Sequence, residues 1–153
     1  MANTTADPFS GDPLVSAHFM VSIDQFAQGF FLEVSGLGSE TEVTEHKLVD
    51  KGGNSIVRKI PGRLKWSDIT LKRGITKNMA FYDWRKIVED GDVDKARANG
   101  TIMMMDQKGD PIAEWTFDMG WPSKVSGPSL KSDSNEIGVE EIVIVHEGVR
   151  RGK

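Results

Sequence analysis

The sequence predicts a mainly β protein with one helix and a β-arm that protrudes from its body. Short stretches in which apolar and polar residues alternate recur along the chain, a period typical of strands with one covered face. Sixteen glycines among 153 residues indicate many turns. Apolar residues at a convincing helical spacing occur once, near the middle of the chain. We therefore expect a turn-rich β fold.

Composition limits the classes of protein that fit. A chain of 153 residues suits one domain, and 38% apolar with 27% charged residues describe an ordinary globular protein. The formal charge of −4 and the pI near 5.4 argue against a general nucleic-acid binder and against attraction to anionic membranes. The chain has no cysteine, which excludes disulfides. Because no signal-like or membrane-length apolar run occurs, we expect synthesis in the cytoplasm without a signal peptide.

The first part of the chain predicts a leader and a hairpin. Residues 1–13 form a polar leader, which we expect to be poorly ordered unless a neighbour holds it. Residues 14–151 then form the single domain. Within it, Val15–Ile23 alternates apolar and polar residues, and Phe30–Val34 follows as a second strand. The short link between them predicts an antiparallel hairpin.

Residues 40–60 predict the arm. Ser39–Leu48 is extended but polar, and Ile56–Ile60 returns beside it. Between them, Asp50–Asn54 contains the glycines and asparagine that tolerate the positive φ of a tight turn. A polar hairpin of this kind leaves backbone edges unpaired and contributes little to the hydrophobic core of its own chain. The pattern therefore indicates a partner.

The remaining elements lie around one helix. Ile60–Thr76 alternates in the period of a strand and is bounded by turn residues at both ends. A helix is expected at about residues 77–90, ended by Gly91, because five apolar residues share one helical stripe. The residues of this helical stripe are Ala80, Phe81, Trp84, Ile87 and Val88. Further strands are expected over residues 101–106, 113–119 and 138–146.

Motifs for metal binding are incomplete. Asp90, Asp92 and Asp94 copy the first ligands of a calcium loop. Lys95 replaces the required glycine, however, and Thr101 stands where the bidentate glutamate belongs. The three histidines show no metal-ligand spacing. A solvated helix end is the simpler interpretation of the aspartates, and we expect no metal site.

Catalytic motifs are also absent. Paired carboxylates occur at Glu114 and Asp118 and at Glu140 and Glu141, but a solvated sheet face explains them with fewer assumptions. No nucleophile elbow or phosphate-binding loop is present. We therefore expect no enzymatic activity and no cofactor.

Several short motifs, in order over about residues 13–151, resemble the tail tube proteins of contractile phage tails and contractile injection systems. Each motif is weak alone, but their order and spacing are specific. The motifs are Val21-Ser22-Ile23-Asp24, Glu33-Val34-Ser35-Gly36-Leu37, Glu40-Thr41-Glu42-Val43, Val57-Arg58-Lys59-Ile60-Pro61-Gly62-Arg63, Ile69-Thr70-Leu71-Lys72-Arg73-Gly74, Tyr82-Asp83-Trp84, Trp121-Pro122-Ser123-Lys124, Ser126-Gly127-Pro128-Ser129-Leu130, Asn135-Glu136 and His146-Glu147-Gly148.

The resemblance implies a fold and an assembly. The fold is a split barrel or sandwich of two antiparallel sheets with one flanking helix. In this family, homohexamer rings stack into a hollow inner tube inside a contractile sheath. The implied partners are therefore other copies of the chain, the sheath protein, baseplate or spike and tube-terminator proteins, and DNA or protein cargo in the lumen. Residence in a phage tail or a tail-like particle, without sequence-specific nucleic-acid binding, is also implied.

The resemblance also assigns roles to the arm, and the strand alternation suggests which residues face the channel. Residues at the interface between subunits and rings are expected on the arm. Glu114, Thr116, Asp118 and Glu140 are candidates for the lumen lining, where acidic side chains repel phosphates. The expected interface residues are Glu40, Glu42, Lys47, Lys51, Gly52, Gly53, Asn54, Arg58, Lys59 and Arg63.

Two other interpretations stay open at this point. A baseplate protein that initiates the tube has the same fold, although the bare length of the chain favours the main tube subunit. A monomeric β-barrel that binds a small ligand fits the strand pattern as well, and it predicts a monomer at every concentration.

Overall fold

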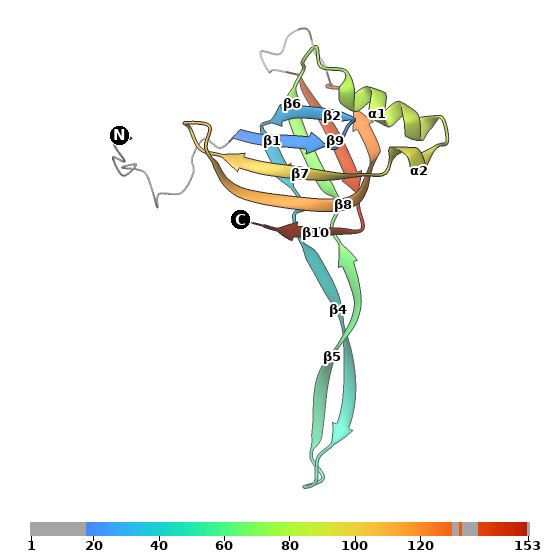
Figure 1. Ribbon diagram of the computed structural model, residues 1–153. Helices are drawn as coiled ribbons and strands as arrows, with labels where there is room; N and C mark the ends of the chain where they lie inside the picture. Colours follow the sequence, from blue (N-terminus) through green and yellow to red (C-terminus); the bar gives the residue numbers. More distant parts are fainter. Residues whose placement is uncertain (1–17, 130–131, 133–137, 153) are drawn as a thin grey trace.

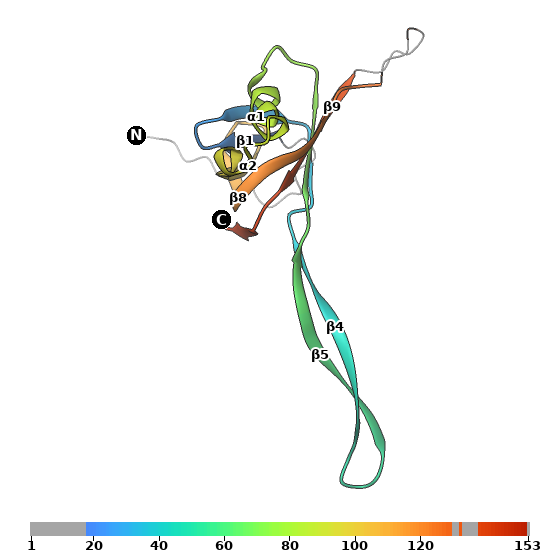
Figure 2. The same ribbon diagram turned by 90° about the vertical axis from the view of Figure 1, so that its right-hand side faces the viewer.

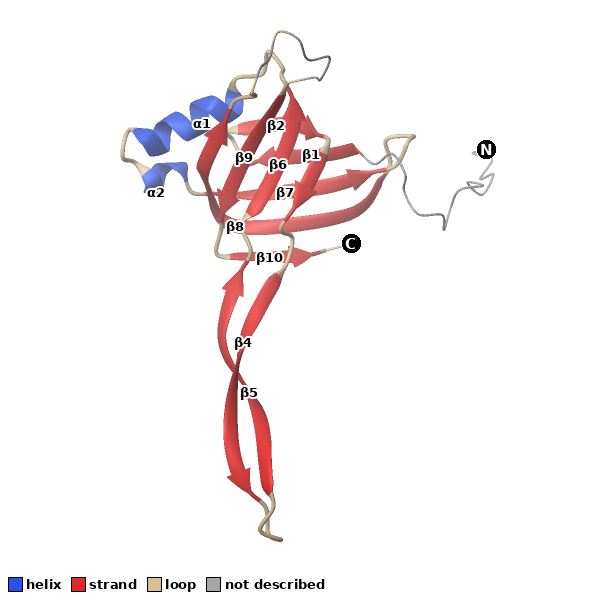
Figure 3. Ribbon diagram, turned by 180° about the vertical axis from the view of Figure 1, so that it is seen from behind, coloured by secondary structure: helices blue, strands red, loops and turns tan. Residues whose placement is uncertain are grey.

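The computed structural model describes residues 18–129, 132 and 138–152, and it shows a β body from which a long hairpin extends (Figure 1). Two helices lie together on one side of the body (Figure 3). The elements are β1 (His18–Ile23), β2 (Ala27–Phe31), β3 (Glu33–Ser35), β4 (Ser39–Val49), β5 (Ser55–Trp66), β6 (Ile69–Gly74), α1 (Ala80–Glu89), α2 (Val93–Ala96), β7 (Ala98–Met105), β8 (Pro111–Ser126), β9 (Val139–Val145) and β10 (Gly148–Arg151).

The body strands follow the order β2-β1-β7-β8-β9-β6-β3, and all neighbours are antiparallel. The long strand β8 belongs to two sheets. Its first part pairs with β7 and β10, and its last part, from Trp121, pairs with β9. The end strands β2 and β3 are not paired with each other, so the barrel is open. The predicted fold class, mainly β with two antiparallel sheets, is confirmed.

The core lies between the two sheets and under α1. In β6, Ile69, Leu71 and Arg73 are buried while the residues between them are partly exposed, as the alternation in the sequence predicts. Phe117 of β8 fills the centre, and Gly100 makes room for it. A Cβ atom on Gly100 would lie 2.2 Å from the Phe117 ring, so this contact requires glycine.

Helix α1 covers the core with the predicted stripe. Phe81 and Trp84 are almost fully buried, and the Trp84 indole donates a hydrogen bond to the backbone carbonyl of Ala96 at 2.7 Å. This bond ties α1 to α2, a short helix that the sequence analysis did not expect. Asp92 accepts a hydrogen bond from the Lys95 backbone N–H and caps α2. Within the described ranges, neither helix has the length and apolar character needed to cross a membrane.

The predicted arm is the hairpin of β4 and β5. It is longer than expected, and in Figures 1 and 2 it extends away from the body. Strands of 11 and 12 residues reach about 35–40 Å at roughly 3.3 Å per residue. Almost every residue of the two strands is exposed. An isolated two-stranded ribbon is marginally stable in water, so we expect a further surface to stabilise the arm.

Candidate assembly surfaces

The tip of the arm is a tight, internally bonded turn. One side-chain oxygen of Asp50 accepts hydrogen bonds from the backbone N–H groups of Gly52 and Asn54, at 2.9 and 2.7 Å. Gly53 has a φ of +79°, which favours glycine. The turn therefore has a defined shape and presents Lys51 to the solvent. A preformed tip loses little conformational entropy when it docks.

The structure places all ten predicted interface residues on the arm, and each is exposed in the single chain. They do not form one patch, because neighbouring residues of a strand point to opposite faces of the ribbon. Lys59, for example, lies opposite Glu45, whereas Arg58 lies opposite His46 on the other face. At the base, Glu42 and Lys65 form an exposed ion pair at 2.6 Å.

The base of the arm is fixed to the body at the bend between β9 and β10. His146 is buried there and accepts the Gly148 backbone N–H on Nδ1 at 3.1 Å. The other ring nitrogen, Nε2, therefore carries the proton and donates to the Ser67 carbonyl at 2.9 Å. Trp66, the last residue of β5, lies over Gly148 and beside the His146 ring. These contacts set the direction of the arm.

Three of the four predicted lumen residues lie on the outer face of β8. Ala113 and Phe117 are buried on the inner face, so Glu114, Thr116 and Asp118 point outward and are partly exposed. Asp118 forms an ion pair with Arg150 of β10 at 3.0 Å. The face is polar, as a hydrophilic wall requires, and its role in a channel stays a prediction.

The assignment of Glu140 to the lumen is wrong. The residue is 5% exposed and its carboxylate points into the body, where it forms an ion pair with Arg73 at 3.0 Å. Glu141, its neighbour, is the one that faces outward, because Ile142 and Ile144 put the even-numbered residues of β9 in the core. A side chain that is buried in the single chain and paired inside the body does not line a channel.

The sequence analysis missed the buried polar cluster around Arg73. Its guanidinium donates to Glu140 and to the backbone carbonyl of Asn78, and it lies 5.3 and 5.1 Å from the ring centroids of Phe31 and Phe81. One signal was available, since Arg73 continues the alternation of buried residues in β6. The cluster links β6, β9 and the start of α1, so its role is to hold the helix on the sheets.

Tyr82 completes this cluster from α1. Its hydroxyl donates to the free oxygen of Glu140 at 3.1 Å. The pKa of Tyr82 is raised above 10, first by desolvation and then by the hydrogen bond to Glu140 and the negative charge of that carboxylate; the positive charge of Arg73 opposes the rise. A raised tyrosine pKa favours the neutral form in the folded protein.

This shift predicts the titration of the only tyrosine in the chain. We expect the phenolate absorbance of the native protein to appear at higher pH than that of the denatured protein. Because the folded state then keeps a proton that the unfolded state has lost, stability falls as pH rises above about 10. Glu140→Gln should move the native pKa down by removing the charge. Equal midpoints for native and denatured protein would contradict the assignment.

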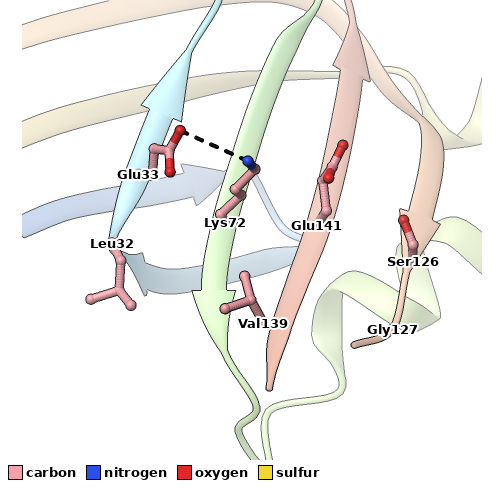
Figure 4. Close-up of a pocket in the computed structure, with 7 residues that line it drawn as sticks. All are labelled: Leu32, Glu33, Lys72, Ser126, Gly127, Val139 and Glu141. Atoms are coloured by element: carbon pink, nitrogen blue, oxygen red, sulfur yellow. Dashed lines mark ion pairs between the residues drawn. The ribbon is translucent and has the colours of Figure 1, made fainter. Parts of the chain in front are cut away.

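A groove crosses the outer face of four strands, β3, β6, β9 and β8 (Figure 4). Its volume is about 440 Å³. Lys72 lies in the middle, 3.9 Å from Glu33 and opposite Glu141 in the strand register. The groove lies on the outer face of the sheet, on the side opposite the buried Leu71 and Ile142. The lining is Leu32, Glu33, Lys72, Ser126, Gly127, Val139 and Glu141.

Comparison with protein families identifies the chain. The family model described as "T4-like virus tail tube protein gp19" matches residues 15–150. The chain belongs to this family. It is therefore a structural tube subunit of a phage tail or of a phage-tail-like particle. No curated protein matches the sequence.

Solved structures resemble this tail tube protein over most of its length. A chain of the extracellular contractile injection system PVC, from its sheath-tube complex in the extended state, is 25% identical; the match covers 92% of this chain and 91% of that one, with a TM-score of 0.72. A chain from the structure of the anti-feeding prophage cap, which terminates the tube of that particle, is 26% identical, with 99% of this chain and 98% of that one covered and a TM-score of 0.73.

A more distant structure shares only the fold. Hcp1 from Flavobacterium johnsoniae is 12% identical and matches over 88% of this tail tube protein and 94% of its own chain, with a TM-score of 0.53. The arm and the outer sheet faces described above are thus surfaces of a tube-forming fold, and the resemblance found in the sequence motifs is confirmed.

Proposed function

We propose that this protein is the main inner tube subunit of a contractile particle. Homohexamer rings stack into a hollow tube inside a sheath, and contraction of the sheath drives the tube and its DNA or protein cargo into a target. The observation that carries this proposal is the arm, which extends away from the described part of the body and belongs to a tube protein. The protein acts as a structural subunit, without a cofactor or enzymatic activity, and its assembly takes place in the cytoplasm.

The exposed residues have different roles in this assembly. The ten predicted arm residues contact neighbouring subunits and stacked rings. Glu114, Thr116 and Asp118 remain the lumen candidates, and Glu140 is withdrawn. Acidic side chains on a channel wall repel phosphates, so they favour passage of nucleic acid over binding. The sheath, the baseplate or spike and a terminator are the expected partners, in line with the assemblies from which the PVC and anti-feeding prophage chains come.

A tube-initiating baseplate protein is the second candidate. A chain of the anti-feeding prophage baseplate has the same fold, with a TM-score of 0.71 at 19% identity. An initiator would form a single ring and would extend only on a second protein. The main subunit would stack with itself.

Electron microscopy of the purified protein, with light scattering on the same sample, tests the proposal. We expect rings or tubes with a central hole and a mass that grows with protein concentration. Single rings that never stack would favour the initiator. A monomer at every concentration and salt, even when baseplate proteins of the same particle are added, would overturn the tube proposal.

A further inference from the structure

Three apolar side chains form a row on the outer face of the body. Met20 of β1 lies opposite Phe30 of β2 and also opposite Met103 of β7, and directly paired residues of antiparallel strands share a face. The face is the outer one, because Val21 and Ile102, their neighbours in sequence, are fully buried. Phe30 is 64% exposed. We call Phe30, Met20 and Met103 the methionine strip.

The methionine strip has the properties of a contact surface. It lies beside the free edge of β2, on strands that face the viewer in Figure 1. Methionine side chains are flexible and polarizable, so they adapt to a partner. The row continues into Glu114, which is opposite Met103 on β8. No ion pair among the described residues includes Glu114, so an apolar strip ends at an uncompensated carboxylate.

One face of the arm has the complementary chemistry. The register puts six residues on it, and we call them the basic face: Thr44, His46, Leu48, Ile56, Arg58 and Ile60. Ile56 and Ile60 are each 40% exposed, and Arg58 is the only residue of this face with a permanent charge. The opposite face carries the acidic Glu45 together with Lys47 and Lys59. The basic face therefore offers aliphatic groups beside a guanidinium.

The charges of the arm and of the rest of the chain have opposite signs. Residues 39–66 include six basic and four acidic residues, a formal charge of +2, while the whole chain carries −4, so the remainder carries −6. Like arms therefore repel each other and are attracted to the bodies of other copies. The arm also extends away from its own body (Figure 2), whereas the methionine strip lies on the body strands β1, β2 and β7.

We propose that the basic face of the arm docks on the methionine strip of a second copy, with Arg58 directed at Glu114. This inference rests on the proposed tube function and names the two surfaces that meet. It assigns Glu114 to a contact between copies instead of the channel wall, for which Thr116 and Asp118 remain the candidates. Leu48, Ile56 and Ile60 cover exposed Phe30 and the half-buried Met20 and Met103, and the ion pair fixes the register. The contact is heterologous, because donor and acceptor surfaces differ, so it links copies in series.

Cysteine crosslinking tests the contact directly, since the natural chain has no cysteine. The variant Ile56→Cys/Met103→Cys is assembled into tubes and oxidised, and covalent multimers are counted on a non-reducing gel. The matched control is Val57→Cys/Met103→Cys, because Val57 lies on the other face of the arm. We expect at least about fivefold more multimers from the first pair, given the narrow distance range of a disulfide. Equal yields would overturn the docking.

Charge reversal gives an independent test. Arg58→Glu places two carboxylates face to face and should lower the yield of tubes by at least about tenfold. Adding Glu114→Arg restores the opposite charges, so the double variant should recover most of the yield. Undiminished tubes from Arg58→Glu, or no recovery in the double variant, would overturn the docking. Failure of the unaltered protein to form rings or tubes would instead overturn the proposed function.

Discussion

Replacing Arg73 by methionine is expected to lower the free energy of unfolding by about 3–5 kcal/mol, because it leaves the buried Glu140 carboxylate without its partner. The two side chains are 3% and 6% exposed, so water cannot replace the lost ion pair. The substitution also removes the hydrogen bond to the Asn78 carbonyl at the start of α1. Urea denaturation of the non-assembled protein measures the change.

The neighbouring residue provides a matched control. Lys72→Met removes an ion pair of the same sheet, but Lys72 and Glu33 are 3.9 Å apart and their side chains are 40% and 61% exposed. We expect a loss below about 1 kcal/mol there. Adding Glu140→Leu to Arg73→Met should recover part of the stability, because no unpaired charge remains. Similar losses for Arg73→Met and Lys72→Met would contradict the view that the buried pair holds α1 in place.

Shortening the arm should abolish assembly while leaving the body folded. The variant joins Val43 to Pro61, which are opposite each other in the register, through a two-residue Asn-Gly turn. The removed residues are almost all exposed, so the free energy of unfolding should change by less than about 1 kcal/mol. Light scattering should show only unstacked species at concentrations where the unaltered protein forms tubes.

A smaller deletion in the arm should have a smaller effect on assembly. Removing only Lys51–Asn54 keeps the strands and should weaken assembly without abolishing it. Normal stacked tubes from the longer deletion would contradict the assignment of the arm to contacts between copies. Loss of cooperative unfolding in that variant would show instead that the body needs the arm for folding.

The sequence predicts those elements whose pattern has a clear period. The alternation in β6, the stripe of α1 and the glycine-rich tip of the arm each correspond to an element of the structure. The motif order also identifies the family, because it extends over nearly the whole chain. The ten arm residues predicted at an interface are all exposed, and their contacts stay a prediction. The sequence does not show which of them share a face of the ribbon.

The error at Glu140 has a physical cause. Val139–Val145 contains two adjacent glutamates followed by four apolar residues, so both phases of the strand satisfy the pattern. Only the pairing with β6, where Arg73 is buried, determines which glutamate points inward. That pairing joins residues 67 positions apart, and local periodicity contains no information about it. The short helix α2 was missed because four residues are too few to show a period.

The joint at His146 makes the arm a lever. With a length of about 35–40 Å, the arm moves its tip by roughly 6 Å for each 10° of rotation at the base. The contacts of Trp66 and Ser67 at the base therefore decide where the distant tip at Lys51 lies. A tip that docks at a defined place therefore requires base contacts that hold the direction of the arm to within a few degrees.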